Sequence, residues 1–317
     1  MNTIDQELLT AISHSAYGEI DYENLLRHNP QKIREQEMRV SLLEADTIIP
    51  PQLDIQNRYI PSSDKGRNIR LRTYRSKEKS NLPILLYFHG GAFIYGTPEQ
   101  YDFIFFRLAS DLDLMIVSVD YRLAPEHPFP AAMEDGYDSL KWLAQYASQL
   151  GGDPNRMLIG GSSAGATIAA SITHLARDKK EIKIRHQLLL YPAMSHLLNT
   201  PSMQSLADAP MQTKNAAKWM WKHYLPHHMD QRPAYAVPLL EENFNQLPDA
   251  TVVVCACDPL KDEGKMYAEK LQRAAVSTEL IEIQGAVHAF DFFESALSEA
   301  FYDRLLNVLK KTVNQDK

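Results

Sequence analysis

A serine between two glycines is the group in this chain best placed for nucleophilic chemistry. Residues 161–165 read Gly-Ser-Ser-Ala-Gly; they follow an apolar segment, 156–160, and lead into a run of small residues, 164–170, that is typical of a helix. Ser163, and not Ser162, has a glycine two positions before it and two positions after it. Side chains at those positions would collide where a strand and a helix cross closely, and the turn strains the serine backbone. The pattern predicts a nucleophilic serine on a strand-to-helix turn, although a short glycine-serine sequence can also be a plain connection.

A serine hydroxyl is a weak nucleophile unless a base takes its proton and a carboxylate orients that base. His288 is the candidate base, because it alone among the eleven histidines follows the last expected strand. Asp258 is the candidate acid, because it is the first acidic residue after the apolar segment 251–257 and reacting groups gather at the carboxyl ends of parallel strands. Asp262 is the alternative acid, although its position at the start of an expected helix suits a capping role.

Two segments offer backbone donors for the oxyanion that forms when a serine attacks a carbonyl carbon. Gly90, Gly91 and Ala92 follow an apolar strand, and Ala164 follows the candidate nucleophile. Because the donors are backbone N–H groups, Ala92 can serve where another glycine might stand. A plain glycine turn is the alternative, but the position one β-α unit before the serine favours an oxyanion hole.

These groups need a sheet that brings them to one edge. Continuous apolar segments predict buried strands, and the alternating segments 55–60 and 69–74 predict exposed antiparallel strands. Helix-like segments between the buried strands imply right-handed β-α-β units, so the predicted fold is α/β, with a mostly parallel central sheet flanked by helices. The expected buried strands are 84–88, 114–119, 157–159, 187–191, 251–255 and 278–283, and the expected helices are 137–147, 166–177 and 262–274. The last strand could be an open sheet edge that pairs with a second copy, as in a homodimer.

Two other parts of the chain are predicted to be helical. Residues 1–50 are amphipathic and end at two prolines, while residues 195–247 hold no buried-strand segment and are too long for a plain loop. We therefore expect a core of residues 51–194 and 248–317 under a helical cap formed by the other two segments. Four bulky cap residues could line a confined apolar pocket or form the core of the cap: Trp219, Met220, Trp221 and Tyr224.

Composition and charge argue against nucleic acid and membrane as partners of this chain. The 317 residues are 44% hydrophobic and 23% charged, which is typical of a globular protein, and the net charge of -7 disfavours nucleic-acid binding. No stretch approaches the roughly 20 apolar residues that span a bilayer, and the first residues lack a secretory signal pattern, so a cytoplasmic location is expected. Cys255 and Cys257 are expected on one strand as small buried residues.

One group of side chains has spacing that could suggest a metal site. His223 and His227 lie four residues apart, with His228 and Asp230 close by. Pro226 interrupts the helix between the first two, and no His-Glu-x-x-His pattern is present. A surface cluster is the expectation, and neither a metal nor an organic cofactor is predicted.

Five segments occur in a telling order: 89–93 (HGGAF), 120–132 (DYRLAPEHPFPAA), 161–165 (GSSAG), 258–264 (DPLKDEG) and 285–290 (GAVHAF). Together they resemble the hormone-sensitive-lipase family of α/β hydrolases, especially its bacterial carboxylesterases. The resemblance implies an α/β-hydrolase fold with a helical cap. It also implies a catalytic triad and an oxyanion hole at these positions: Ser163, Asp258 and His288; Gly90, Gly91, Ala92 and Ala164.

The sequence departs from the family pattern at four positions. Ala92, Ala166 and Ala289 stand where the family usually has glycine, and Ser162 stands where it usually has aspartate. No reacting group is lost. We expect Ala92 to restrict the acyl site and Ser162 to alter the local hydrogen-bond network.

The function implied by the resemblance is a serine carboxylesterase. Its substrate would be a small uncharged ester with a short acyl chain, hydrolysed through an acyl-enzyme. An amide or formamide hydrolase would use the same triad, and a non-catalytic small-molecule receptor on this fold is the alternative from another class. The presence of His288 argues against the receptor. Asp120, Glu126 and His127 could do acid-base chemistry, but the prolines around them favour a structural loop.

Overall fold

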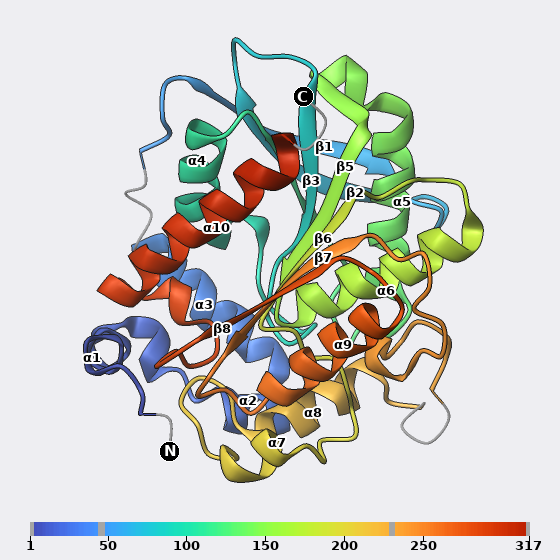
Figure 1. Cartoon of the computed structure of the whole chain (residues 1–317). Helices are drawn as coiled ribbons and strands as arrows, with labels where there is room; N and C mark the ends of the chain where they lie inside the picture. The colour runs from blue at the N-terminus through green and yellow to red at the C-terminus, as the bar shows by residue number, and fades with distance from the viewer. Residues whose placement is uncertain (1–2, 44–47, 228–231, 315–317) are drawn as a thin grey trace.

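A single eight-stranded sheet runs through the protein. The structure, a computed structural model, describes residues 3–43, 48–227 and 232–314. The strand order is β1-β2-β4-β3-β5-β6-β7-β8; β2 is antiparallel to β1 and to β4, and every other neighbouring pair is parallel (Figure 1). The strands are β1 (Leu53–Pro61), β2 (Asn68–Ser76), β3 (Leu82–Phe88), β4 (Met115–Asp120), β5 (Gly152–Ser162), β6 (His186–Leu190), β7 (Asp249–Cys255) and β8 (Thr278–Ile283). The predicted mostly parallel sheet and the edge position of its last strand are confirmed.

Most strand bounds agree with the sequence patterns to within a residue or two, with two differences. β5 begins at Gly152, five residues before the predicted start, because polar residues occupy its first half. β7 ends at Cys255, so the prediction that Cys257 shares its strand is wrong. Both cysteines are nevertheless buried, as expected of small core residues.

Side chains of β3 alternate between two hydrophobic cores, one on each face of the sheet, because successive residues of a strand point in opposite directions. Ile84, Leu86 and Phe88 pack in one core, and Leu85 and Tyr87 pack in the other. The first core includes residues of α5 (Ala131–Tyr146), α6 (Ala164–Lys179) and α9 (Lys261–Arg273); the second includes residues of α4 (Asp102–Asp111) and α10 (Ala296–Asn314). The predicted helices on the first face are confirmed, and α4 and α10 add to them.

Helices from the N-terminal segment and from the segment between β6 and β7 meet beyond one end of the sheet. They are α1 (Gln6–His14), α2 (Tyr22–His28), α3 (Pro30–Leu43), α7 (Pro201–Ser205) and α8 (Lys214–Tyr224). Figure 1 shows α2, α7 and α8 together below the sheet, and α2 packs directly against α8. Asn215 Nδ2 donates to Glu23 Oε1 over 2.7 Å, which links the two segments. The predicted helices of both segments are confirmed.

Of the predicted histidine cluster, the structure describes His223 and His227, and His227 is exposed. His223 Nε2 lies 2.7 Å from the backbone oxygen of Leu26 and can donate to it. His228 and Asp230 lie outside the described residues. In the described parts of the chain, no three His, Cys, Asp or Glu side chains are grouped so that they could hold a metal ion.

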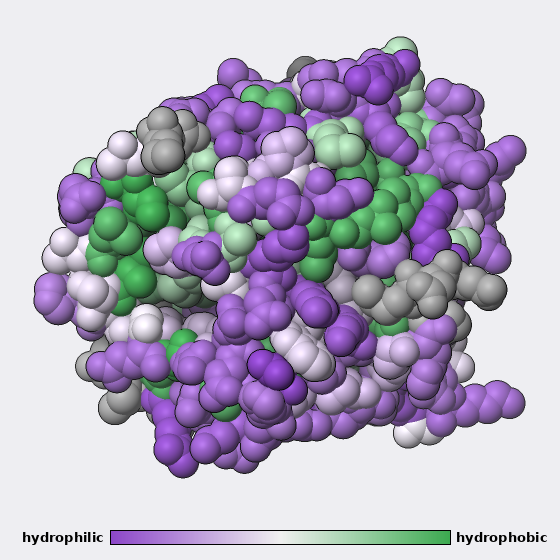
Figure 2. Space-filling view, turned by 90° about the horizontal axis from the view of Figure 1, so that it is seen from below, coloured by the Kyte–Doolittle hydropathy of each residue, from purple (hydrophilic) through white to green (hydrophobic). Residues whose placement is uncertain are grey.

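The face below the sheet carries hydrophobic groups among hydrophilic ones (Figure 2). Met38 on α3 is 63% exposed and contributes apolar surface near this end of the molecule. None of the helices in the described ranges has the length and apolar character needed to cross a membrane.

Candidate active site

Ser163 lies on the turn between β5 and α6 in a strained backbone conformation, with φ 53° and ψ -122°. A Cβ atom at Gly161 would lie 2.4 Å from the carbonyl carbon of Gly165, and one at Gly165 would lie 2.1 Å from the backbone oxygen of Phe88. The strand and the helix therefore cross too closely for any side chain at either glycine. This is the steric requirement that the sequence predicted.

The side chains of Ser163, His288 and Asp258 form one hydrogen-bonded row. His288 Nε2 lies 2.8 Å from Ser163 Oγ, and His288 Nδ1 lies 2.6 Å from Asp258 Oδ2. An ionised carboxylate can only accept, so Nδ1 donates to Asp258, and Nε2 is left to accept the serine proton. All three residues are at most 7% exposed. The row can move a proton from the serine hydroxyl to the imidazole.

The alternative acid, Asp262, faces another part of the chain. Asp262 Oδ2 accepts from the backbone N–H of Ser202 over 2.7 Å. Asp258 instead holds its carboxylate toward His288, and its other oxygen accepts from the N–H of Leu260 over 2.9 Å. The structure thus brings Asp258, and not Asp262, to the histidine.

A second carboxyl group lies near His288 that the sequence reasoning missed. Tyr191 packs edge-on against the imidazole, with ring centroids 5.1 Å apart, and its hydroxyl donates to Asp291 Oδ1 over 2.8 Å. Burial raises the pKa of Asp291 to about 6, while the Tyr191 hydrogen bond and nearby His288 lower it. Its position three residues after the candidate base was the available signal.

The predicted oxyanion donors line the space in front of Ser163. Gly90, Gly91 and Ala92 border the same pocket as Ser163 and His288, and Ala164 begins α6, where the first N–H groups of a helix are free to bind an anion. The Gly90 N–H differs from the others, because it already donates to the Tyr101 hydroxyl over 2.8 Å. In the chain as described, the amides of the other three donate to no protein group, so they are the available donors.

Ser162 contacts Tyr101, the residue whose hydroxyl accepts from the Gly90 N–H. Its hydroxyl is fully buried and lies 2.5 Å from the Tyr101 hydroxyl. The network therefore runs from Ser162 through Tyr101 to the Gly90 amide, and it ties β5 to the start of the donor loop. Ser162, which stands where the family usually has aspartate, is thus hydrogen-bonded to the neutral hydroxyl of Tyr101.

The pocket in front of Ser163 is walled by residues from both helical segments and from the core. Its volume is about 90 Å³. Tyr17, Tyr22 and Glu37 come from the N-terminal helices, and Met211 and Gln212 come from the segment after β6. These residues, which the sequence patterns do not single out, line the pocket together with Ser163 and His288.

The four bulky residues of α8 pack in or against the hydrophobic core and do not line the pocket. Met220, Trp221 and Tyr224 are at most 1% exposed and belong to the hydrophobic core. The Tyr224 ring stacks on Phe93 with centroids 3.7 Å apart. Trp219 is partly buried against the same core, with Lys222 Nζ 4.4 Å from its ring. They hold α8 in place and leave the lining of the pocket to other residues.

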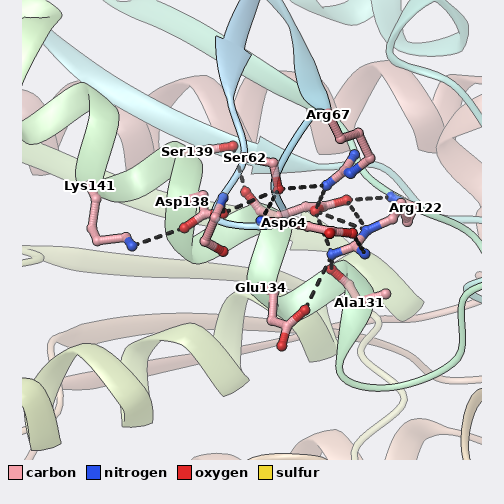
Figure 3. A network of polar contacts seen from close by, with 11 residues as sticks. Ser62, Asp64, Arg67, Arg122, Ala131, Glu134, Asp138, Ser139 and Lys141 are labelled. Atoms are coloured by element: carbon pink, nitrogen blue, oxygen red, sulfur yellow. Dashed lines mark hydrogen bonds and ion pairs between the residues drawn. The ribbon is translucent and has the colours of Figure 1, made fainter.

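The segment 120–132 is held by a polar network away from the pocket (Figure 3). Arg122 donates to the buried Asp135 through its backbone N–H over 2.9 Å, and its guanidinium pairs with Asp135 and with Asp64. Arg67 from the β1-β2 turn pairs with Asp135 as well. Glu126 pairs with Arg34 of α3. These contacts support the structural interpretation of the loop.

Fold and site together define an α/β hydrolase, and comparisons with known proteins agree. A sequence model described as the alpha/beta hydrolase fold matches residues 85–292. The chain belongs to this family, in the branch that resembles hormone-sensitive lipase.

Relatives and solved structures place the chain among esterases. Esterase LipI of Mycobacterium tuberculosis (strain ATCC 25618 / H37Rv) is 39% identical over 214 residues, 67% of each chain. Carboxylesterase NlhH of the same organism is 35% identical over 257 residues, 80% of each chain. A bacterial heroin esterase superposes with a TM-score of 0.90 at 29% identity, over 98% of both chains. EstE1, a thermostable carboxylesterase from a metagenomic library, gives a TM-score of 0.84 at 35% identity, over 90% of this chain and 98% of that one. The prediction of a carboxylic ester hydrolase is confirmed at the level of the family.

Proposed function

We propose that this protein is a serine carboxylesterase that hydrolyses small esters with short acyl chains. The observation that carries the proposal is the hydrogen-bonded row from Ser163 through His288 to Asp258, which opens into a small pocket. The relatives named as esterases and carboxylesterases support the same substrate class.

In the proposed first step, Ser163 Oγ attacks the ester carbonyl carbon while His288 Nε2 takes its proton. Asp258 orients the imidazole and stabilises its protonated form. The N–H groups of Gly91, Ala92 and Ala164 are placed to bind the oxygen that becomes negative, while Gly90 borders the hole and holds the loop through Tyr101. The alcohol leaves with the proton from His288, and an acyl-enzyme is formed.

In the second step, water attacks the acyl-enzyme carbonyl and gives its proton to His288. Ser163 then leaves with that proton, and the acid is released. Every proton is carried by His288, so this scheme needs no metal or organic cofactor.

The substrate proposal follows from the size of the pocket. A space of about 90 Å³ suits a short acyl chain, and the methyl group of Ala92 lies on its wall. The reference substrates for this proposal are uncharged p-nitrophenyl esters. We expect kcat/KM to fall as the acyl chain grows from acetyl to octanoyl, and Ser163→Ala to abolish turnover. Retained hydrolysis by that variant would refute the triad.

Two other functions use the same site. An amide or formamide hydrolase would show comparable rates on matched ester and amide substrates, whereas the proposed esterase strongly prefers the ester. A non-catalytic receptor would bind a small ester without turning it over. The spacing of 2.8 Å between His288 Nε2 and Ser163 Oγ favours catalysis over the receptor.

We further propose that residues 1–50 and 195–247 act together as the cap of a core formed by 51–194 and 248–317. The direct packing of α2 on α8 supports this division. The edge strand β8 offers a place for a second copy of the chain to pair. Light scattering after size-exclusion chromatography tests that dimer, and a mass of one chain at all concentrations would exclude it.

A further inference from the structure

A buried carboxyl group on α3 faces the substrate pocket and takes no part in the proposed reaction. Glu37 is 6% exposed and lines the pocket together with Ser163 and His288. Tyr22 OH donates to Glu37 Oε1 over 2.9 Å, and Gln100 Nε2 donates to Glu37 Oε2 over 2.9 Å. Each oxygen uses one of its two acceptor positions, so the carboxylate can accept further interactions from the pocket.

No cation neutralises this carboxylate within the described parts of the chain. Both of its hydrogen-bond partners are neutral, and the ion pairs of these residues do not include Glu37. Arg34, one turn earlier on α3, is held by Glu126 and by backbone oxygens instead. A buried carboxylate without a positive partner is costly, and burial raises the pKa of Glu37 to about 7, although its two hydrogen bonds lower it.

Aromatic rings stand beside the carboxyl group in the same wall. Tyr22 and Tyr95 have ring centroids 5.4 Å apart at an angle of 32°, and Tyr17 lines the pocket next to them. Burial raises the pKa of Tyr22 and of Tyr95, so both remain neutral at physiological pH. Aromatic faces next to a carboxylate attract ammonium groups through cation–π and ionic interactions. The other titratable groups that line the pocket, and that a bound cation could meet, are those of His288, Tyr17 and Tyr101.

We propose that Glu37, Tyr22 and Tyr95 form a binding site for an ammonium group carried by the ester substrate. The site determines specificity: it favours a cationic ester over its neutral isostere and disfavours an anionic one. The inference rests on the proposed esterase function, and it extends the substrate class beyond the uncharged reference esters. Above pH 7 Glu37 is ionised in the empty pocket, so the preference for the cation grows as the pH rises.

The test uses two pairs of esters that differ only in charge. Choline acetate and 3,3-dimethylbutyl acetate place the charge in the alcohol. The ethyl ester of trimethylglycine and ethyl 3,3-dimethylbutanoate place it in the acyl group. For each pair, the ratio of kcat/KM for the charged over the neutral ester cancels the titration of the triad. We expect this ratio, for at least one pair, to rise about tenfold between pH 5.5 and 8.5.

Glu37→Gln keeps the size of the side chain and removes the charge. We expect it to lower the ratio for that pair about tenfold at pH 8.5 and to make the ratio independent of pH. Glu35→Gln is the matched control, because it removes one charge from an exposed position of the same helix and should leave the ratio unchanged. Thermal unfolding of both variants checks that they fold.

Equal ratios in the wild type and Glu37→Gln for both pairs would overturn the ammonium site. So would a wild-type ratio that stays constant from pH 5.5 to 8.5, a result that needs no variant. Hydrolysis of the neutral esters, and its loss in Ser163→Ala, tests the esterase itself. An enzyme that hydrolyses the neutral esters without preferring the cation refutes only the ammonium site.

Discussion

Replacing Tyr101 by phenylalanine tests how residues 90–92, the proposed oxyanion loop, are held. The hydroxyl of Tyr101 accepts from the Gly90 N–H over 2.8 Å and lies 2.5 Å from Ser162 Oγ. Its ring packs edge-on against Phe292 with centroids 5.0 Å apart, a contact that phenylalanine keeps. Tyr101→Phe therefore removes one oxygen and leaves the buried Ser162 hydroxyl and the partly buried Gly90 N–H without that partner.

The expected cost follows from those two groups. A buried donor left without an acceptor costs about 1–3 kcal/mol. The Gly90 N–H is only partly buried and the Ser162 hydroxyl can rotate, so we expect the free energy of unfolding to fall by about 1–3 kcal/mol in all. Loss of an oxyanion donor costs about 100-fold to 1000-fold in kcat, and a displaced loop should cost less. We expect kcat for p-nitrophenyl acetate to fall about 10-fold to 100-fold, with little change in KM.

Urea denaturation and steady-state kinetics give the two measurements. Tyr302→Phe is the matched control. Its hydroxyl donates to Asp111 over 2.8 Å, and Tyr302 does not line the pocket. It should lower stability without changing kcat. Ser162→Ala combined with Tyr101→Phe should cost less than the sum of the two changes, because the two hydroxyls share one hydrogen bond. A kcat within twofold of the wild type in Tyr101→Phe, at the expected loss of stability, would refute the positioning role.

Three further changes test other parts of the structure. Gly165→Ala places a methyl group against the backbone of β3 and should cost about 2–4 kcal/mol in the free energy of unfolding as well as most of the activity, both measurable on the purified variant. Burial raises the pKa of Glu263 to about 8, so the folded state holds its proton to a higher pH than the unfolded state does. The free energy of unfolding therefore falls as the pH rises from about 4.5 to 8. Glu263→Gln should therefore gain stability relative to the wild type over that range, by a few kcal/mol in urea denaturation, and parallel pH curves for the two proteins would contradict the burial argument. Burial raises the pKa of Asp291 to about 6, and once ionised it should stabilise protonated His288. Asp291→Asn should lower kcat/KM about twofold to fivefold above pH 6 and leave it unchanged at lower pH, as a pH-rate profile would show.

The strands and the reacting groups were predictable because both depend on short stretches of sequence. The continuous apolar segment 84–88 predicts a strand buried on both faces, and it forms the centre of the sheet. Parallel strands then bring their carboxyl ends to one edge, so chain order selected Ser163, Asp258 and His288 as the proposed triad, and the structure places their side chains in hydrogen-bond contact. β5 was predicted too short because its first residues are polar. They also lie at a shift in register, since β5 pairs with β3 at Gly152 and then again from Met157.

The supports of the site were not predictable from short patterns, because they join distant parts of the chain. Tyr101 meets Ser162 across 61 positions, and Tyr191 meets Asp291 across 100. A tyrosine gives no local sign of the group that its hydroxyl will bind. Such contacts are set by the packing of helices on the sheet, which the periodicity of each segment leaves open.

Glu37 is different, because its position on α3 does give a signal. Ile33, Glu37 and Val40 are spaced by four and three residues, which places them on one face of a helix, and all three are buried. An apolar residue is expected in the middle of such a stripe, and an acid there is buried at a cost that the fold does not recover through an ion pair among the described residues. A buried acid in such a stripe is a candidate for binding where it also lines a pocket, as Glu37 does and Glu263 does not. In this chain the stripe turns that acid into the pocket that holds Ser163.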